Sequence, residues 1–358
     1  MTADSPSALA RPAIGAVSAE QLRDWLGERG QPPYRARQLA RWLALGYEFQ
    51  SMDDLPADLR RELADSYRAS SLRLLRRTES DGGLTSKVLH QLDGGYTVEA
   101  VVMRYPDRST LCISSQVGCP IGCPFCATGK GPFGRNLRPH EIADQAVEAA
   151  RELRLEGRRL SHVVFMGMGE PLANYTAVLE AVRRIADSGG LAISPRRITI
   201  STAGLVPRIE QLAAEGLAVT LAISLHAARD ELRDELVPIN KRYPLADLLA
   251  AADGFARRTG RRVSYEWVLL AGVNDTDRDA QELVGLLRGR LAHVNLIPFN
   301  PVDDTPYREP SRGQVHHFAA RLRAGGLTVT VRDTRGRDSE AACGQLRARV
   351  LAEGATLR

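Results

Sequence analysis

Residues 118–129 place three cysteines within eight positions, in the spacing C-x3-C-x2-C, and read Gly118-Cys119-Pro120-Ile121-Gly122-Cys123-Pro124-Phe125-Cys126-Ala127-Thr128-Gly129. Thiolates this close together can hold three corners of an iron–sulfur cluster. The glycines and prolines between them supply the tight turns that aim the sulfur atoms inward. Because only three cysteine ligands are present, one iron of such a cluster would stay open.

The alternative use of these cysteines is a structural zinc site. Structural zinc usually takes four ligands in two spaced pairs, and the nearest downstream histidine, His140, leaves no matching second pair. Two of the five cysteines, Cys112 and Cys343, lie outside the triplet, and this odd, crowded distribution is not that of a disulfide framework. In a reducing compartment such clusters usually bind metal. The spacing therefore favours an iron–sulfur cluster and leaves zinc as the lesser alternative.

Length and composition limit the class of protein. A chain of 358 residues is long for a single hydrophobic core, so we expect one large domain with smaller attachments. No apolar run approaches the ~18 residues that span a bilayer, and residues 1–16 lack the basic flank and apolar core of a signal peptide. We therefore expect a cytoplasmic protein without a membrane partner, and a monomer as the default state.

The first part of the chain divides into three segments. Residues 1–17 are rich in Ala, Pro and Ser and are predicted to be a disordered tail. Residues 18–70 are predicted to form a small helical domain, because Ser18 and Gln21 make a capping box and leucines recur at helical spacing. Residues 71–104 are predicted to form a β-hairpin extension, in which two alternating segments flank a glycine turn.

The charge of the chain permits an RNA partner. The net charge is +5, although 48 basic residues include only three lysines, an arginine bias that a GC-rich genome also produces. Several arginines of the helical domain could meet phosphates or form an ordinary solvated helix face. These residues are Arg35, Arg37, Arg41, Arg60 and Arg61.

From residue 105 onward, short β-branched or apolar runs alternate with helical patterns. Strands are predicted at residues 111–115, 163–166, 197–201, 219–224, 263–269, 293–298 and 327–332. Helices are predicted near residues 141–153, 175–186, 206–214, 244–258, 277–288 and 314–324. This α/β alternation over residues 105–338 predicts a parallel sheet closed into a full or partial (β/α) barrel. In such folds the chemistry collects at the C-terminal ends of the strands.

Polar and glycine-rich stretches follow several of these strands. The stretch over residues 165–171 ends Gly167-Met168-Gly169-Glu170-Pro171, where glycines let the backbone approach a ligand and Glu170 can take an ammonium group. An ordinary tight loop has the same composition. Later strands end in Ser201, in Ser224-Leu225-His226 and in the run to Asn300, and each of these is singly more typical of a helix cap or a satisfied turn.

The cysteine spacing and the Pro-Phe-Cys step resemble those of the radical S-adenosylmethionine (SAM) enzymes. The resemblance implies a partial barrel carrying a [4Fe-4S] cluster on Cys119, Cys123 and Cys126. It implies that the open iron binds the amino and carboxylate groups of SAM, which electron transfer cleaves to a 5′-deoxyadenosyl radical. It also implies SAM contacts from the strand-end residues Gly169, Glu170, Ser201, Ser224, Leu225, His226 and Asn300.

Three further runs narrow the resemblance to the RlmN family of radical SAM RNA methyltransferases. They are Thr110-Leu111-Cys112-Ile113-Ser114-Ser115-Gln116-Val117-Gly118-Cys119, Leu236-Val237-Pro238-Ile239-Asn240-Lys241 and Ala341-Ala342-Cys343-Gly344-Gln345-Leu346. The match covers nearly the whole chain in order. It implies methylation of C2 of an adenosine in 23S rRNA and in transfer RNAs (tRNAs), with folded RNA bound by the helical domain and the hairpin, and electrons from a donor such as flavodoxin.

The resemblance also implies roles for three residues outside the cysteine loop. Cys343, in the C-terminal segment 339–358, accepts a methyl group from one SAM and, after hydrogen abstraction by the radical from a second SAM, adds to C2 as a methylene radical. Cys112 resolves the adduct by forming a transient disulfide with Cys343, and Glu99 is the proton acceptor. Without the resemblance, Cys112 and Cys343 are more typical of buried core thiols.

Two other functions stay open at this point. The related Cfr enzymes methylate C8 of the same ribosomal adenosine and share the cysteines, although the extended N-terminal domain favours C2. The other function is that of a zinc-dependent RNA-binding protein without catalysis, which the cysteine spacing disfavours.

Overall fold

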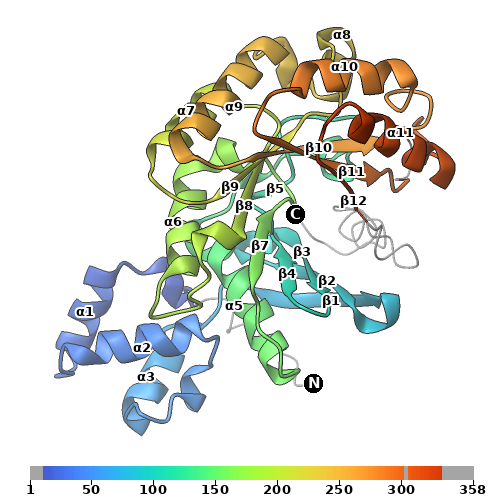
Figure 1. The fold of residues 1–358 in the computed structure, drawn as a ribbon. Coiled ribbons are helices and arrows are strands. Elements are labelled where there is room, and N and C mark those ends of the chain that lie inside the picture. The colour runs from blue at the N-terminus through green and yellow to red at the C-terminus, as the bar shows by residue number, and fades with distance from the viewer. Residues whose placement is uncertain (1–10, 302–304, 333–358) are drawn as a thin grey trace.

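The computed structural model describes residues 11–301 and 305–332, and its centre is a ten-stranded sheet (Figure 1). In spatial order its strands are β1 (Arg73–Ser80), β2 (Thr85–Gln91), β3 (Thr97–Arg104), β4 (Ser109–Cys112), β7 (His162–Phe165), β8 (Ile198–Thr202), β9 (Thr220–Ser224), β10 (Val263–Leu269), β11 (Ala292–Pro298) and β12 (Val329–Val331). Neighbouring strands from β1 to β4 are antiparallel, whereas β4 and β7 to β12 are parallel. The predicted α/β class and parallel sheet are confirmed.

Helices connect the parallel strands and pack on the outside of the sheet (Figure 1). They are α5 (Pro139–Leu155), α6 (Tyr175–Ala186), α7 (Val206–Ala214), α8 (Asp230–Leu236), α9 (Leu245–Thr259), α10 (Asp277–Leu287) and α11 (Arg312–Ala324). In α6, Val178, Val182 and Ile185 recur at helical spacing and are fully buried, which is why this segment folds as a helix against the sheet. The result is the expected partial barrel. Among the described residues, no helix is long and apolar enough to cross a membrane.

The register of the sheet separates an inner face from an outer face. Cys112 lies opposite Val101, and Val101 lies opposite Lys87, so these three side chains point to the same side. Glu99, two positions before Val101, points to that side as well. Leu111 points the other way, into the core that also contains residues of α5. Along these strands the inner face therefore carries Lys87, Glu99 and Cys112, whereas the outer face packs against α5 through apolar residues such as Leu111.

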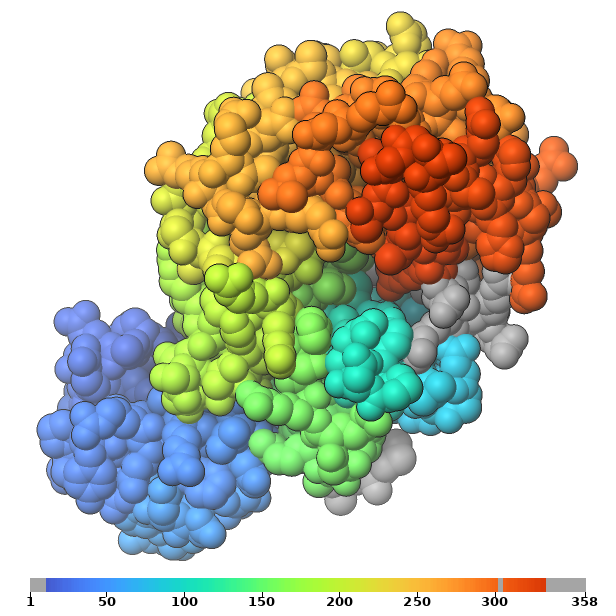
Figure 2. All heavy atoms as spheres, in the orientation of Figure 1, coloured from blue at the N-terminus to red at the C-terminus, as the bar shows by residue number. Residues whose placement is uncertain are grey.

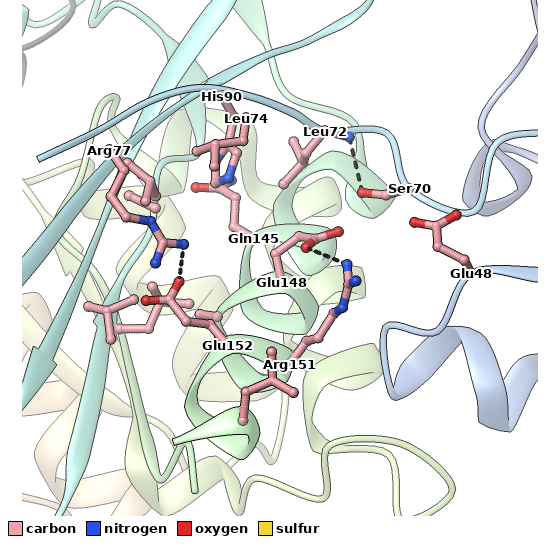
Figure 3. A pocket seen from close by; sticks show the side chains of 16 residues that line it. Glu48, Ser70, Leu72, Leu74, Arg77, His90, Gln145, Glu148, Arg151 and Glu152 are labelled. Carbon is pink, nitrogen blue, oxygen red and sulfur yellow. Dashed lines mark hydrogen bonds and ion pairs between the residues drawn. The ribbon is translucent and has the colours of Figure 1, made fainter. Parts of the chain in front are cut away.

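A cavity of about 420 Å³ lies on the outer face, between α5 and strands β1 to β3 (Figure 3). Apolar strand residues such as Val88 and Ala100 line it, together with charged residues such as Arg77 and Glu152. His90 also lines it, and burial, aided by the charge of Arg77, lowers the pKa of His90 to about 4. Because Glu99 and Cys112 point to the opposite face, this cavity is separate from the predicted site.

A small N-terminal unit is built from α1 (Ala19–Gly27), α2 (Tyr34–Ala44) and α3 (Ala57–Ser66) around its own apolar core. It forms a lobe at one side of the barrel (Figure 2). The predicted capping box is present, because Ser18 Oγ accepts from Gln21 N–H at 3.1 Å and Gln21 Oε1 accepts from Ser18 N–H at 2.9 Å. The predicted helices are therefore confirmed, whereas RNA binding by this unit stays a prediction.

The longest elements without a counterpart among the predicted ones are β1 and α8. β1 is an exposed edge strand, so its sequence lacks the apolar alternation that marks a half-buried strand. Its pairing with β2 also shifts register between Leu74 and Arg76. α8 has only seven residues, most of them charged. As a consequence, the predicted hairpin is in fact part of a three-stranded antiparallel addition that continues the barrel sheet.

Candidate active site

The cysteine loop is closed at its base by a short ladder in which β5 (Gln116–Val117) pairs with β6 (Arg135–Asn136). Gly118, with a φ of +79°, opens the loop, and a Cβ there would lie 2.3 Å from the carbonyl oxygen of Pro132. Only glycine fits this position. Cys126 leads into the single turn α4 (Ala127–Lys130), where a Cβ on Gly129 would lie 2.9 Å from the carbonyl oxygen of Cys123. The loop is therefore wound tightly around its cysteines.

The three thiols of this loop are half-buried and act on one another electrostatically. Burial raises the pKa of Cys119 to about 12, and the neighbouring Cys126 and Glu170 add to this effect. Burial also raises the pKa of Cys123, with Cys126 and Cys119 as further causes. A bound metal reverses this preference, because a coordinating thiol is deprotonated.

The three thiols can be considered as ligands of an iron–sulfur cluster or of a single zinc ion. Within residues 11–301 and 305–332, no three His, Cys, Asp or Glu side chains form a group that could hold a metal ion. The three thiols lie close enough together to act on one another electrostatically, and all three belong to one tightly wound loop. An iron–sulfur cluster takes its thiolates at separate corners, so this donor set fits a cluster of that kind.

An apolar layer surrounds the cysteine loop. Phe125, between the second and third cysteines, packs edge-on against the ring of His226, with ring centroids 5.0 Å apart. The other buried members of this layer come from the segments after β8, β9, α8, β10 and β11, and they are Ala203, Ala227, Leu236, Val237, Leu270 and Phe299. The loop therefore lies over the C-terminal ends of the parallel strands, where their polar end residues also lie.

Gly169 and Glu170 lie in the loop after β7 and contact two other segments of the site, those that contain Gln116 and Ala203. Gly169 has a φ of +104°, and a Cβ there would lie 2.6 Å from the Gln116 side chain. Glu170 is 3% exposed, and its carboxylate accepts from the N–H groups of Leu172 at 3.0 Å and Ala203 at 2.7 Å. Burial raises the pKa of Glu170 to about 7 despite these hydrogen bonds. Glu170 is thus a buried acid that can change its charge near neutral pH.

His226 has the most constrained backbone among the predicted SAM contacts. Its φ is +58°, a left-handed conformation that costs energy in a non-glycine residue and is enriched at functional sites. Its Nδ1 accepts from Val268 N–H at 3.0 Å, so the neutral ring carries its proton on Nε2. Burial, and then the charge of Arg233, lower the pKa of His226 to about 3. The ring is therefore a neutral donor at physiological pH.

The other predicted SAM contacts lie at the ends of β8, β9 and β11. Ser201 is buried, and its hydroxyl donates to the carbonyl oxygen of Phe165. Ser224 is half-buried, and Leu225 is buried with its N–H donating to Glu266 O at 3.0 Å. Asn300 is half-buried two positions beyond β11. The structure thus gathers these residues at one end of the barrel, and their contact with SAM stays a prediction.

Glu99 and Cys112 are both buried on the inner face of the sheet. Glu99 Oε2 lies 4.0 Å from Lys87 Nζ, so a positive charge stands beside this carboxylate. Burial raises the pKa of the Cys112 thiol, an effect that the charge of Arg332 opposes most strongly. Cys343, the predicted methyl carrier, lies outside the described residues, as does the C-terminal segment 339–358.

Buried amide side chains that are not among the predicted site residues also hold the loops in place. Gln116 Nε2 donates to Asn136 Oδ1 at 2.7 Å, while Gln116 Oε1 accepts from Glu170 N–H at 2.7 Å. Asn174 donates to two backbone carbonyls of neighbouring loops, at 2.9 and 2.8 Å. Gln116 lies in the run of residues 110–119, and its place in that run is the sequence signal that could have identified it.

Two buried charged residues near the strand ends are also new. Glu266 on β10 is 5% exposed and accepts from Ser264 Oγ and Asn295 Nδ2, both at 2.7 Å. A lone acid among the apolar residues of β10 is a signal that could have identified it. Arg233 in α8 is completely buried, and the charged sequence around it is typical of an exposed helix, so no sequence signal marked it.

Comparison with known proteins identifies two families of domain in this chain. A family model described as the radical SAM superfamily matches residues 113–284. A second, described as the ribosomal RNA large subunit methyltransferase N-terminal domain, matches residues 14–68. The first match contains the cysteine loop and the strand ends around it, and the second contains α1 to α3.

Similar proteins match over nearly the whole chain. Relatives named "Probable dual-specificity RNA methyltransferase RlmN" are 52% identical in Frankia alni, covering 95% of this chain and 84% of the relative, and 50% identical in Thermobifida fusca, covering 93% of each. The crystal structure of a radical SAM methyltransferase from Sphaerobacter thermophilus is 46% identical, with a TM-score of 0.89 over 93% of this chain and 98% of that one. This chain therefore belongs to the RlmN family of radical SAM RNA methyltransferases.

Proposed function

We propose that this chain methylates C2 of a specific adenosine in 23S rRNA and in tRNAs. The observation that carries the proposal is that Glu99 and Cys112 share the inner face of the barrel, on the strands that lead into the cysteine loop. Adenine C2 is electron-poor and does not attack SAM as a nucleophile, so its methylation needs a radical route and a residue that accepts the displaced proton. A buried carboxylate and a buried thiol on the strands that precede the loop supply the groups for such a route.

In this proposal the cysteine loop holds the cofactors that the radical SAM family uses. Cys119, Cys123 and Cys126 hold the [4Fe-4S] cluster, which together with SAM supplies a carbon radical when bound. The buried carboxylate of Glu170 accepts the SAM ammonium group, which provides the positive charge that this acid otherwise lacks. The remaining polar contacts come from Gly169, Ser201, Ser224, Leu225, His226 and Asn300.

Three residues handle the methyl group and the proton. Cys343 carries the methyl group as a thioether and becomes joined to C2 through a methylene bridge. Glu99 accepts the C2 proton, and the Lys87 ammonium at 4.0 Å stands beside the carboxylate that does so. Cys112 would then attack the Cys343 sulfur: the S–S bond forms as the bond between that sulfur and the methylene carbon breaks, the released carbon takes a proton and becomes the methyl group on C2, and the unpaired electron of the adduct is given up to a one-electron carrier.

In this proposal the N-terminal helical unit binds the RNA. Arg37 and Arg41 are exposed and lie one turn apart on α2, so they present two positive charges on the same face of the helix. The match of residues 14–68 to a ribosomal RNA methyltransferase N-terminal domain supports this assignment. An external protein such as flavodoxin supplies the electron.

Mass spectrometry of nucleosides from 23S rRNA and tRNA, after reaction with the reduced enzyme and SAM, tests the proposal. We expect 2-methyladenosine, and its absence would remove the proposed function. Finding 8-methyladenosine in its place would assign the activity of the Cfr relatives. Stoichiometric zinc without iron and sulfide in the anaerobically purified protein would support the non-catalytic RNA-binding alternative.

A Cys343→Ala variant tests the assigned methyl carrier separately. The cluster does not use this residue, so we expect wild-type iron and sulfide content together with loss of methyl transfer. A variant that still forms 2-methyladenosine would show that Cys343 does not carry the methyl group.

A further inference from the structure

We call the cysteine loop and the strand-end segments around it, which contain Glu170, Ala203 and His226, the cysteine pocket. Arg233 is a charged residue of this pocket that the proposed function does not use. Arg233 lies in α8, and its side chain is completely buried. Its guanidinium donates to the carbonyl oxygens of Leu225 at 3.0 Å, Ala203 at 2.7 Å and Ser224 at 3.1 Å, and to Asn240 Oδ1 at 2.8 Å. These acceptors are all neutral. Arg233 therefore links the segments after β8 and β9 that carry predicted SAM contacts, without gaining a counter-ion from them.

The nearest carboxylates are held away from Arg233 by an amide. In the described part of the chain, no carboxylate forms an ion pair with this arginine. Asp230 and Asp234 both accept from Asn240 Nδ2, at 2.9 and 2.7 Å, while Asn240 Oδ1 accepts from Arg233. The anion-forming group that acts most strongly on Arg233 is Cys123 of the cysteine loop. Cys123 packs in the same apolar layer as Ala203, whose carbonyl oxygen accepts from Arg233, so the arginine charge lies close to the cysteine loop and acts on Cys123 as well as on Asp230 and Asp234.

Burying an arginine without a counter-ion is costly, because its charge loses hydration that neutral acceptors replace only in part. Burial lowers the pKa of Arg233 to about 10, which leaves the side chain cationic at neutral pH. Its field reaches the pocket, since it contributes to the lowered pKa of His226. An anion next to Cys123 would balance this charge.

We propose that Arg233 is a fixed positive charge that raises the reduction potential of the cluster bound by Cys119, Cys123 and Cys126. The inference rests on the proposed function, because it requires that cluster. Reduction adds one electron, taken from an external one-electron donor, to a cluster that three thiolates already make anionic. A buried cation stabilises the more negative state, and cluster potentials depend on such local charge and burial.

The competing explanation is that Arg233 only fastens the segments after β8 and β9 through its hydrogen bonds. The two explanations separate when charge and hydrogen-bond geometry are changed independently. Arg233→Met removes both, whereas Arg233→Lys keeps the charge and loses the planar fork of donors. Arg229→Met is a matched control, because Arg229 is the N-cap residue of the same helix but, unlike Arg233, pairs with the two carboxylates of Asp279 and Glu282.

The test is a redox titration of the reconstituted full-length proteins, with dithionite as reductant and the reduced cluster followed by electron paramagnetic resonance. Iron content per chain is measured in parallel. We expect a more negative midpoint potential for R233M and wild-type potentials for R233K and R229M. A wild-type potential in R233M, or a shift in R233K as large as that in R233M, would overturn the inference. If R233M does not fold, Arg233→Gln takes its place as the variant without charge: a more negative potential in R233Q beside an unchanged one in R233K supports the inference, and a wild-type potential in R233Q overturns it.

This experiment distinguishes failure of the inference from failure of the proposed function. A wild-type protein that binds no iron and sulfide, or that leaves adenosine C2 unmethylated, would remove the proposed function. A wild-type protein that binds the cluster and methylates C2, with a potential insensitive to Arg233, would remove only the role of this arginine.

Discussion

Two regions of this molecule bury charged side chains, and they balance those charges in different ways. Where β3 packs on α5, Arg104 is 7% exposed and donates to Glu152 at 2.7 Å and to Glu156 at 2.6 and 2.7 Å. Its hydrogen bonds to Glu156, more than any other cause, raise the pKa of Arg104. In the cysteine pocket, Arg233 and Glu170 are more deeply buried, and their hydrogen bonds in the described residues go to neutral groups.

The difference separates a structural ion network from a ligand pocket. The Arg104 network contains its own counter-ions and is electrically complete within the chain. The cysteine pocket holds a buried cation and a buried acid, both near Cys123, whose counter-charges the described chain does not supply as ion pairs. Such an arrangement costs stability in the free protein and lowers the cost of binding charged ligands. We infer that the pocket is prepared for an anionic cluster and the ammonium group of SAM.

The largest effect is expected when the cysteine pocket loses a thiol that binds the cluster, because the buried charges of this pocket then lose the ligand that balances them. We expect Cys123→Ser to lose the cluster and all methyl transfer, because a hydroxyl is a poor substitute for a thiolate at a cluster corner. Iron and sulfide content and nucleoside analysis measure the two losses. Cys112→Ser is the matched control, with an expected intact cluster and no released product. Full methyl transfer by C123S would show that this pocket does not hold the cluster.

The next largest effect concerns the charge of Glu170 in the cluster-free protein. Its pKa is about 7 in the folded state and 4.5 when exposed, so folding favours the protonated acid. Its contribution to stability is fully present below pH 4.5 and is lost as the pH rises through 7, a change of about 3 kcal/mol in the free energy of unfolding. Urea unfolding at pH 5 and pH 8 measures this, and Glu170→Gln is expected to flatten the dependence.

Affinity for SAM is expected to change with pH in the opposite direction. The ammonium group of SAM binds the ionised carboxylate, so affinity rises as the pH passes through 7 in the wild-type protein. In E170Q we expect binding to be about tenfold weaker at pH 8, from the loss of a charge-assisted hydrogen bond, and less dependent on pH. Equilibrium dialysis with labelled SAM decides, and equal affinities of the two proteins at pH 8 would contradict the assigned contact.

In the Arg104 network, Arg104→Met is expected to cost stability and leave the cluster unchanged. The substitution strands Glu152 and Glu156, whose side chains are 15% and 35% exposed, so part of the penalty is relieved by solvent. We expect a loss of about 2 kcal/mol in the free energy of unfolding, below the range for fully buried pairs. Chemical unfolding measures the loss, and a redox titration serves as control. A shifted cluster potential would mean that the two regions are not independent.

Much of the barrel could be predicted because strands and helices repeat apolar residues with different periods. The bounds of α6, α7 and β10 agree with the predicted residues 175–186, 206–214 and 263–269. β1 escaped prediction because an exposed edge strand needs no apolar alternation. The period of apolar residues shows which face of a single helix or strand is apolar. It does not show which polar residues become buried when the elements pack together.

The same limit explains which site residues were missed. Glu170 could be predicted as a candidate because it follows a glycine-rich strand end, a local pattern. Arg233 could not, since its burial depends on the carbonyl groups of Ala203, Ser224 and Leu225, which lie outside its helix. An arginine among acids on a short helix is normally solvated. Here the neighbouring Asp230 and Asp234 accept from Asn240, and neither forms a direct ion pair with the arginine.

The smallest effect comes from the exposed edge of the Arg104 network. Arg77 Nη2 lies 2.5 Å from Glu152 Oε2, but the Arg77 side chain is 36% exposed and Arg104 continues to pair with the same carboxylate. We expect Arg77→Met to cost only about 0.5 kcal/mol in the free energy of unfolding, and less in high salt, because solvent screens this pair. Urea unfolding at low and high salt measures both values. A loss as large as that of R104M would mean that burial does not determine the contribution of these charges, and the contrast between the two regions would then need another cause.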